Sequence, residues 1–157
     1  MATTCITDKF KTDALNGVHN FAGGSPKTYK FLLIKPAPAG AYDKTLQNVG
    51  TPGPGGGTPS VTNVGTDEAS GTGYTSGGAT MGAATVSLQT DTATVDFSGN
   101  PSWTGASFSA VCGVLYESVS KDVVAVFDFG GTITCTSGTF TVTLPASGAS
   151  TSLVRLA

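Results

Sequence analysis

Charged side chains are scarce in this sequence of 157 residues. They make up 11% of the chain, against roughly 25% in an average soluble domain. Arg155 is the one arginine, and the lysines lie within positions 9–44 or at Lys121. A protein that binds DNA or RNA needs a basic surface to neutralise phosphates. The composition therefore argues against nucleic acid as a partner.

Cysteine and histidine are also sparse. The three cysteines, Cys5, Cys112 and Cys135, are widely spaced and include no C-x-x-C pair, which argues against a zinc site and against a disulfide framework. We expect reduced, mostly buried thiols. His19 is the only histidine, so a Ser-His-Asp or Cys-His mechanism would have to use it. No G-x-S-x-G elbow supplies a nucleophile for it, and we expect no metal, no cofactor and no enzymatic activity.

Long hydrophobic runs are missing. The longest are residues 31–34 and 123–127, far below the ~18 residues that a membrane helix needs. Four charged residues between positions 8 and 13 interrupt the N-terminal region, so it has no apolar core of the signal-peptide kind. We expect a chain that stays in the cytosol of the cell that makes it and has no membrane partner.

Glycine, serine and threonine are abundant, and short runs alternate between apolar and polar residues. The length suits one domain, residues 1–157. Eight short runs with turn residues between them predict a mainly β fold, an antiparallel and jelly-roll-like β-sandwich with one short N-terminal helix. The predicted strands are residues 28–35, 84–89, 93–98, 106–118, 122–129, 132–137, 139–145 and 152–157.

The long strand at 106–118 is predicted to bury one face, because apolar residues recur there at every second position. The second and third strands form a hairpin, and so do the strands at 106–118 and 122–129. A strand register that shifts by one residue would turn the whole face over. The residues expected on this face are Phe108, Ala110, Cys112, Val114 and Tyr116.

The predicted helix spans residues 6–18 in an N-terminal segment, residues 1–21. Apolar residues recur there every four positions, Thr7 or Thr4 is a candidate N-cap, and Asn16-Gly17 is a stop signal. Such a short helix is marginal alone, so we expect its stripe to dock on the sandwich or on an adjacent subunit. The predicted partner-binding residues are Ile6, Phe10, Ala14 and Val18.

The sandwich, residues 22–157, contains a long loop at about residues 36–66. Its middle, residues 51–59, is almost purely glycine, proline and threonine, which excludes a helix or a central strand. A loop of this length within a compact domain is usually functional or mobile. We expect it to lie on the surface, where it is a second candidate for partner contact.

Two short motifs look like nucleotide sites. Gly71-Thr72-Gly73 and Gly77-Gly78 resemble a phosphate-binding loop, but neither a helix nor a lysine follows them. We interpret them as a tight turn that leads into a strand, with Tyr74 packed across it. Asp128-Phe129-Gly130 matches the metal-binding tripeptide of kinases without the other kinase motifs, and we interpret it as a strand end followed by a turn at Gly130-Gly131.

Four aspartates lie at predicted turns and strand ends. A calcium site is conceivable, but no loop has the alternating Asp/Asn spacing of known sites, and a glycosidase needs two carboxylates that face each other. Trp103 is the lone tryptophan, and its place at the start of a long strand favours a core position over an exposed sugar platform. The aspartates are Asp91, Asp96, Asp122 and Asp128.

Four stretches, in this order, resemble the small virion structural proteins of tailed bacteriophages and prophages. They are "ITDKFKTDALNGVHNF" followed by "TYKFLLI", then "SGTGYTSGGATM", then "VDFSGNPSWTGASFSAVCGVLYES", and finally "VVAVFDFGG" through "GTFTVTLPASGASTSLVRLA". Together they cover most of the chain. Residues 36–66 are longer and richer in proline and glycine than the corresponding loop of such proteins.

The resemblance implies a non-enzymatic particle component and transfers no catalytic residues. It suggests a capsid decoration or cement protein, made in the bacterial host cytoplasm and found in the virion. Its expected partners are the major capsid protein or other virion proteins, and we expect a homo-oligomer, with a trimer favoured. Many copies on a repeating lattice gain affinity through avidity and need neither strong charge nor a pocket.

Two other hypotheses stay open at this point. The chain is a tail- or fibre-associated module that binds another virion protein, or a host glycan through Trp103, Tyr74 or Tyr42. Alternatively, it is a hydrolase that uses His19 or a pair of aspartates.

Overall fold

The computed structural model describes residues 2–157 and confirms a mainly β chain with a short N-terminal helix. Both predicted hairpins form, each with a turn of only a few residues. One 3₁₀ turn, Gly65–Asp67, lies in the long loop. The elements are β1 (Cys5–Ile6), α1 (Asp8–Leu15), β2 (Tyr29–Ile34), β3 (Ala79–Thr80), β4 (Ala84–Gln89), β5 (Thr92–Phe97), β6 (Ser102–Glu117), β7 (Val123–Thr141) and β8 (Val154–Leu156).

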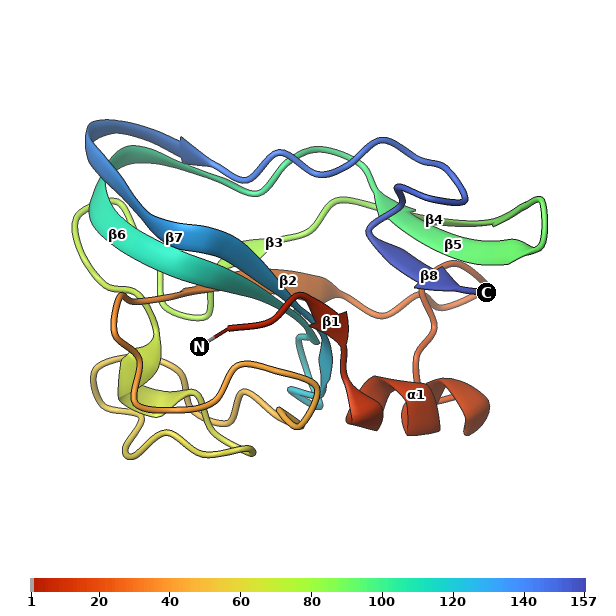
Figure 1. Cartoon of the computed structure of the whole chain (residues 1–157), viewed down its shortest axis with the longest axis horizontal. Coiled ribbons are helices and arrows are strands. Elements are labelled where there is room, and N and C mark those ends of the chain that lie inside the picture. Colours follow the sequence, from red (N-terminus) through yellow and green to blue (C-terminus); the bar gives the residue numbers. More distant parts are fainter. Residues whose placement is uncertain (1) are drawn as a thin grey trace.

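The strands form two antiparallel sheets, as expected for a β-sandwich. Five strands lie in the order β1-β7-β6-β2-β3, and three in the order β4-β5-β8. In Figure 1 the long β6–β7 hairpin fills one end of the molecule, the three-stranded sheet lies at the other, and α1 lies below this smaller sheet. The helix and the C-terminal strand therefore meet at the same end of the chain's fold.

The prediction of three separate strands from residue 122 onward, with a turn at Gly130-Gly131, is wrong for β7. It is one strand, Val123–Thr141. The pairs Ala110–Ile133 and Cys112–Asp128 lie two residues apart in β6 but five residues apart in β7. Gly130 has a φ of 74°, a conformation that glycine adopts without strain. The two glycines therefore bulge the strand and bend it instead of ending it.

The predicted common face of β6 is also wrong in part. Phe108 and Ala110 belong to one buried cluster, while Cys112, Val114 and Tyr116 belong to a second cluster. The strand register shifts between Ala110 and Cys112. Such an irregularity moves the following side chains to the opposite face.

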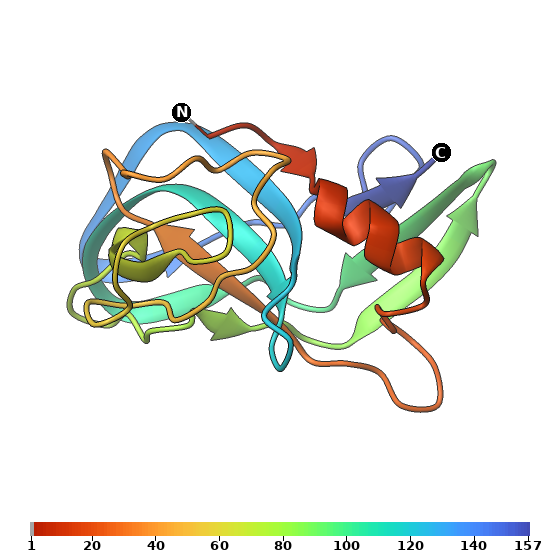
Figure 2. The same ribbon diagram turned by 90° about the horizontal axis from the view of Figure 1, so that it is seen from below.

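The central part of the five-stranded sheet, formed by β2 and the adjoining parts of β6 and β7, is buried on both faces, which the alternation along its strands did not indicate. In β2, Phe31 and Leu33 pack into the first cluster, and Leu32 and Ile34 pack into the second. The second cluster is closed by four apolar side chains from the long loop, and Figures 1 and 2 show this loop, in orange to yellow, lying against the sheet. These side chains, all at most 1% exposed, are Tyr42, Leu46, Val49 and Val64.

The loop at residues 36–66 is therefore a structural layer as well as a surface. Its glycine-rich middle, residues 51–59, is mostly exposed, as predicted. Its backbone is nevertheless tied down: Thr66 N–H donates to the Gly57 carbonyl at 3.1 Å, and the Asn63 amide donates to the Gly56 carbonyl at 2.7 Å. Hydrogen bonds between segments of the loop therefore take the place of the regular backbone hydrogen bonds of a β-sheet.

Candidate functional site

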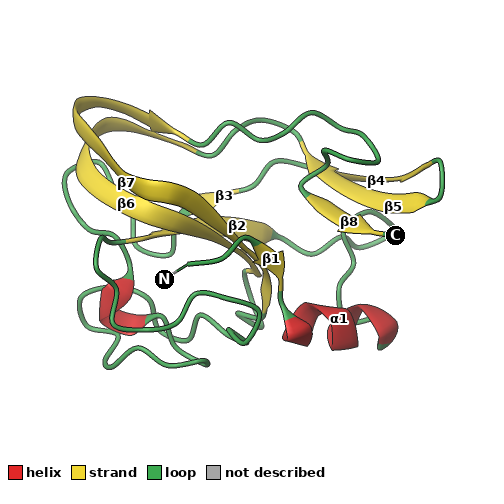
Figure 3. Cartoon of the chain, viewed as in Figure 1, coloured by secondary structure: helices red, strands yellow, loops and turns green. Residues whose placement is uncertain are grey.

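The predicted helix at 6–18 is shorter in the structure, and Figure 3 shows it directly after the small strand β1. Thr7 is its N-cap, as predicted, and its hydroxyl accepts a hydrogen bond from Phe10 N–H at 3.2 Å. Ile6 lies in β1, where it pairs with Ala125 of β7, and Val18 lies beyond the end of the helix. The cap and the positive φ of Gly17, 67°, limit the helix to two turns.

The four predicted partner-binding residues consequently do not form one helical stripe. Phe10 is 2% exposed and packs within its own chain, 5.0 Å from the His19 ring and 6.0 Å from the Phe21 ring. Ile6 and Ala14 are half-buried against the same cluster, and Val18 is half-buried. Phe10 thus docks on the sandwich, one of the two expected positions. Contact of these residues with a partner remains a prediction.

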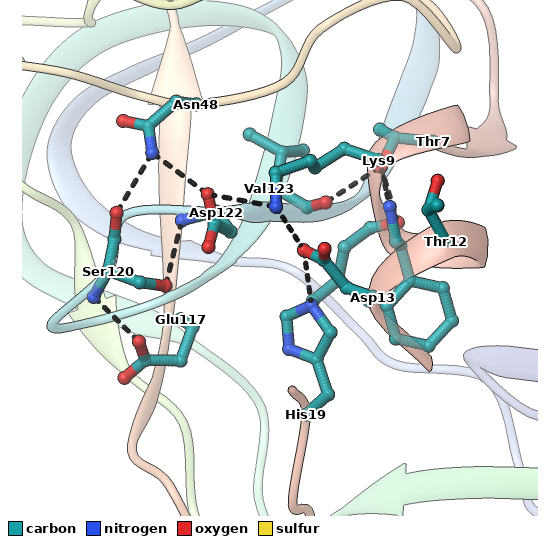
Figure 4. A network of polar contacts seen from close by, with 12 residues as sticks. Thr7, Lys9, Thr12, Asp13, His19, Asn48, Glu117, Ser120, Asp122 and Val123 are labelled. Atoms are coloured by element: carbon teal, nitrogen blue, oxygen red, sulfur yellow. Dashed lines mark hydrogen bonds and ion pairs between the residues drawn. The ribbon is translucent and has the colours of Figure 1, made fainter. Parts of the chain in front are cut away.

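A network of polar side chains fixes α1 to the β6–β7 turn (Figure 4). Lys9 lies 2.5 Å from the Asp13 carboxylate and 3.6 Å from that of Asp122. The Asn48 amide donates to Asp122 at 3.1 Å, and the Thr7 hydroxyl donates to the Val123 carbonyl at 2.7 Å. Burial alone would lower the pKa of Lys9, but the carboxylates raise it above its ordinary value. Lys9 therefore keeps its charge, and the network joins elements that are distant in sequence.

His19 lies at the inner end of this network. Its side chain is 1% exposed, its Nε2 atom lies 3.6 Å from Asp13, and its Nδ1 atom lies 3.4 Å from the Tyr29 hydroxyl. Burial lowers the pKa of His19, and the Asp13 carboxylate opposes this shift only in part. In residues 2–157 no serine or cysteine side chain bonds to the ring. The hydrolase hypothesis would need a nucleophile that this geometry does not bring to His19.

The four predicted aspartates are dispersed. Asp91 is exposed in the β4–β5 turn, and Asp96 accepts from the Ser152 hydroxyl at 2.9 Å. Asp128 accepts from Gly130 N–H at 3.1 Å, and Asp122 belongs to the α1 network. Across the described residues no cluster of three or more histidine, cysteine or acidic side chains is arranged to hold a metal ion.

Two buried carboxylates at the end of the long loop, Asp67 and Glu68, were missed by the sequence analysis. Asp67 is fully buried and accepts from Ala39 N–H at 3.0 Å, Gly40 N–H at 2.7 Å and the Tyr42 hydroxyl at 3.0 Å, with Lys35 at 3.4 Å. Burial would raise its pKa, but these donors hold the pKa of Asp67 below the ordinary value. It therefore organises the start of the loop, a structural role.

The adjacent Glu68 organises the glycine-rich turn. It is 3% exposed and accepts from the Tyr74 hydroxyl at 2.9 Å, the Ser76 hydroxyl at 2.7 Å and Gly77 N–H at 2.6 Å. Burial raises the pKa of Glu68 although these donors oppose the shift. The amide that a phosphate loop would offer to an anion is thus used by a carboxylate of the chain, and Gly77-Gly78 lead into β3, as predicted. The sequence signal that could have indicated their structural role was the occurrence of two consecutive acidic residues, Asp67 and Glu68, in a chain with few charges.

The aromatic candidates are core residues. Trp103 is 5% exposed, which confirms the core position. It stacks on Tyr74 at 5.8 Å and meets Phe108 edge-on at 6.2 Å, so Tyr74 packs across its loop as predicted. Tyr42 is 1% exposed. A glycan would therefore find neither Trp103 nor Tyr42 on the surface.

One groove of the surface, about 520 Å³ in volume, runs between β1 and the C-terminal segment. It is lined by Cys5, Phe127, Pro145 and Arg155 among others. All three cysteines are free in the described chain: Cys112 is buried, as predicted, and the other two are half-buried.

No helix within residues 2–157 combines the length and the apolar character needed to cross a membrane.

Comparison of the chain with protein-family models, with curated proteins and with solved structures gives no match.

Proposed function

We propose that this chain is a non-enzymatic structural protein of a tailed-bacteriophage virion, where it decorates or cements the capsid as a homo-oligomer. The proposal depends first on the four sequence stretches that resemble such proteins. The structural observation that supports the proposal best is that many of the acidic groups stabilise the fold of the chain itself. Four of the ten acidic side chains are buried and hold the helix, turns or loop segments of the chain in place: Asp13, Asp67, Glu68 and Glu117.

The surface that remains is rich in hydroxyl groups and in strands. The outer part of the β6–β7 hairpin is exposed and carries threonines and serines, with Ser109 and Thr134 paired across it at 2.7 Å. Uncharged strands and hydroxyls suit contacts repeated over a lattice, because many weak contacts add up through avidity. The expected partner is the major capsid protein.

The test is the copy number and position of the protein in purified particles of the phage or prophage that encodes it. Quantitative mass spectrometry should find an amount comparable to that of the major capsid protein, and cryo-electron microscopy should lose a surface density when the gene is deleted. A few copies per particle would favour a tail or fibre position. Particles that lack the protein altogether would refute a virion role.

A further inference from the structure

The outer edge of β4 has no partner strand. β4 is the terminal strand of the three-stranded sheet (Figure 2, light green). Ser98 N–H donates to the Ala83 carbonyl at 2.9 Å, so odd-numbered positions bond to β5, and the backbone groups of Ala84, Val86 and Leu88 point away from it. Within residues 2–157 no other element bonds to these groups. Such an edge is a template for another strand.

This edge carries none of the usual protection against pairing. Exposed edge strands normally carry lysines, prolines or inward-pointing charges, but β4 has the sequence ATVSLQ. Val86 is 50% exposed and Leu88 is 73% exposed. A neutral, apolar edge favours a partner strand that is itself neutral and apolar.

A groove lies at the beginning of the same strand. It has a volume of about 480 Å³, and its lining includes Phe21, Met81, Ala84 and Phe97. Ala84 pairs with Phe97, and alternation places Ala84 on the same face of β4 as Val86 and Leu88. An apolar side chain that arrives opposite Ala84 would meet this groove.

We propose that β4 is a self-association site, at which two copies of the chain pair their β4 strands antiparallel about a two-fold axis at Val86. The outward backbone groups lie at positions 84, 86 and 88, so full overlap places Val86 beside Val86 of the second copy and Leu88 opposite Ala84. Leu88 of each copy then reaches the mouth of the other copy's groove. Each copy supplies both the apolar side chain, Leu88, and the groove that receives its counterpart, as an isologous contact requires.

The paired β4 strands join two three-stranded sheets into one sheet of six strands. A two-fold contact builds dimers and other even-numbered assemblies, in contrast to the trimer expected from the sequence. The contact is a property of the purified chain and does not depend on the proposed virion role. Loss of self-association and absence from the particle are therefore separate results.

Sedimentation velocity over a range of concentrations tests the contact with Leu88→Lys and the control Val119→Lys. Val119 is 85% exposed, and it lies in the β6–β7 turn, which belongs to the other sheet. The parent chain and the control should sediment as dimers. Leu88→Lys should weaken the dimer by about 100-fold or more, because the two-fold axis uses the position twice and each tenfold step is about 1.4 kcal/mol.

A cross-linking experiment keeps the test decisive if Leu88→Lys alters folding. In a Cys5→Ser, Cys135→Ser background, a short bismaleimide should cross-link Val86→Cys into covalent dimers, since directly opposed positions place Cβ atoms about 5 Å apart. Val119→Cys should stay monomeric on a denaturing gel. A parent chain that is monomeric throughout, a Leu88→Lys dimer as tight as the control, or equal cross-linking at both positions would overturn the proposal.

Discussion

Truncation of Phe10 measures how far α1 contributes to the stability of the single chain. The ring is 2% exposed and contacts both His19 and Phe21, so Phe10→Ala should lower the free energy of unfolding by about 3–5 kcal/mol. A domain has about 5–15 kcal/mol in total. The expected fall in melting temperature is roughly 10 °C, at about 2–4 °C per kcal/mol for a chain of this size.

Leu15→Ala is the matched control, because Leu15 lies on the same helix and is 91% exposed. It should change stability by less than about 0.5 kcal/mol. Urea denaturation followed by circular dichroism and by the fluorescence of Trp103, the single buried tryptophan, provides both values. A loss below about 1 kcal/mol for Phe10→Ala, or equal losses for the two variants, would refute the packing of α1 described above. A folded Phe10→Ala chain with unchanged oligomer mass and capsid binding would refute the predicted partner contact of α1.

Three further predictions concern the long loop, acid stability and the thiols. Gly56→Ala should lower the free energy of unfolding by about 1–3 kcal/mol, because a Cβ at this position would lie 1.7 Å from the Thr51 carbonyl oxygen. Gly55→Ala, with open space around it, should leave stability unchanged. Equal melting temperatures of the two variants would contradict a packed loop. Asp67→Asn should lower stability at pH 7 by about 2–3 kcal/mol. The folded pKa of Asp67 is depressed, so this difference should be present above about pH 4 and shrink as the pH falls through the folded pKa; a constant difference in denaturation from pH 7 to 2 would be the contrary result. Burial raises the pKa of Cys112 to about 12, so mass spectrometry at pH 8 should find this thiol unmodified in native protein, and rapid alkylation there would show that it is accessible.

Local patterns were sufficient to predict the hairpins and the strand at 28–35. The β4–β5 hairpin has a two-residue turn, so the alternation on both sides is visible within one short window. The N-cap at Thr7 is equally local. Features of this kind depend on neighbours in sequence, and the structure confirms them.

The second core layer could not be predicted in this way. Tyr42, Leu46, Val49 and Val64 are buried without a regular period, because the position of the loop depends on β6 and β7, which are distant in sequence, as well as on β2. The shift of register in β6 likewise depends on its pairing with β7. A pattern in one strand therefore could not show that Phe108 and Cys112 belong to different layers.

The distribution of charge connects the fold to the proposed assembly. In a chain with ten acidic and eight basic residues, the ion pairs and buried carboxylates of Asp13, Asp67 and Glu117 anchor turns and the helix. Charges used in this way cannot also guard strand edges, and guarding edges is how most β proteins stay monomeric. The β4 edge, with the sequence ATVSLQ, carries no such charge. In the dimer proposed above, the second copy would cover this edge, as would suit the proposed role as one of many identical copies.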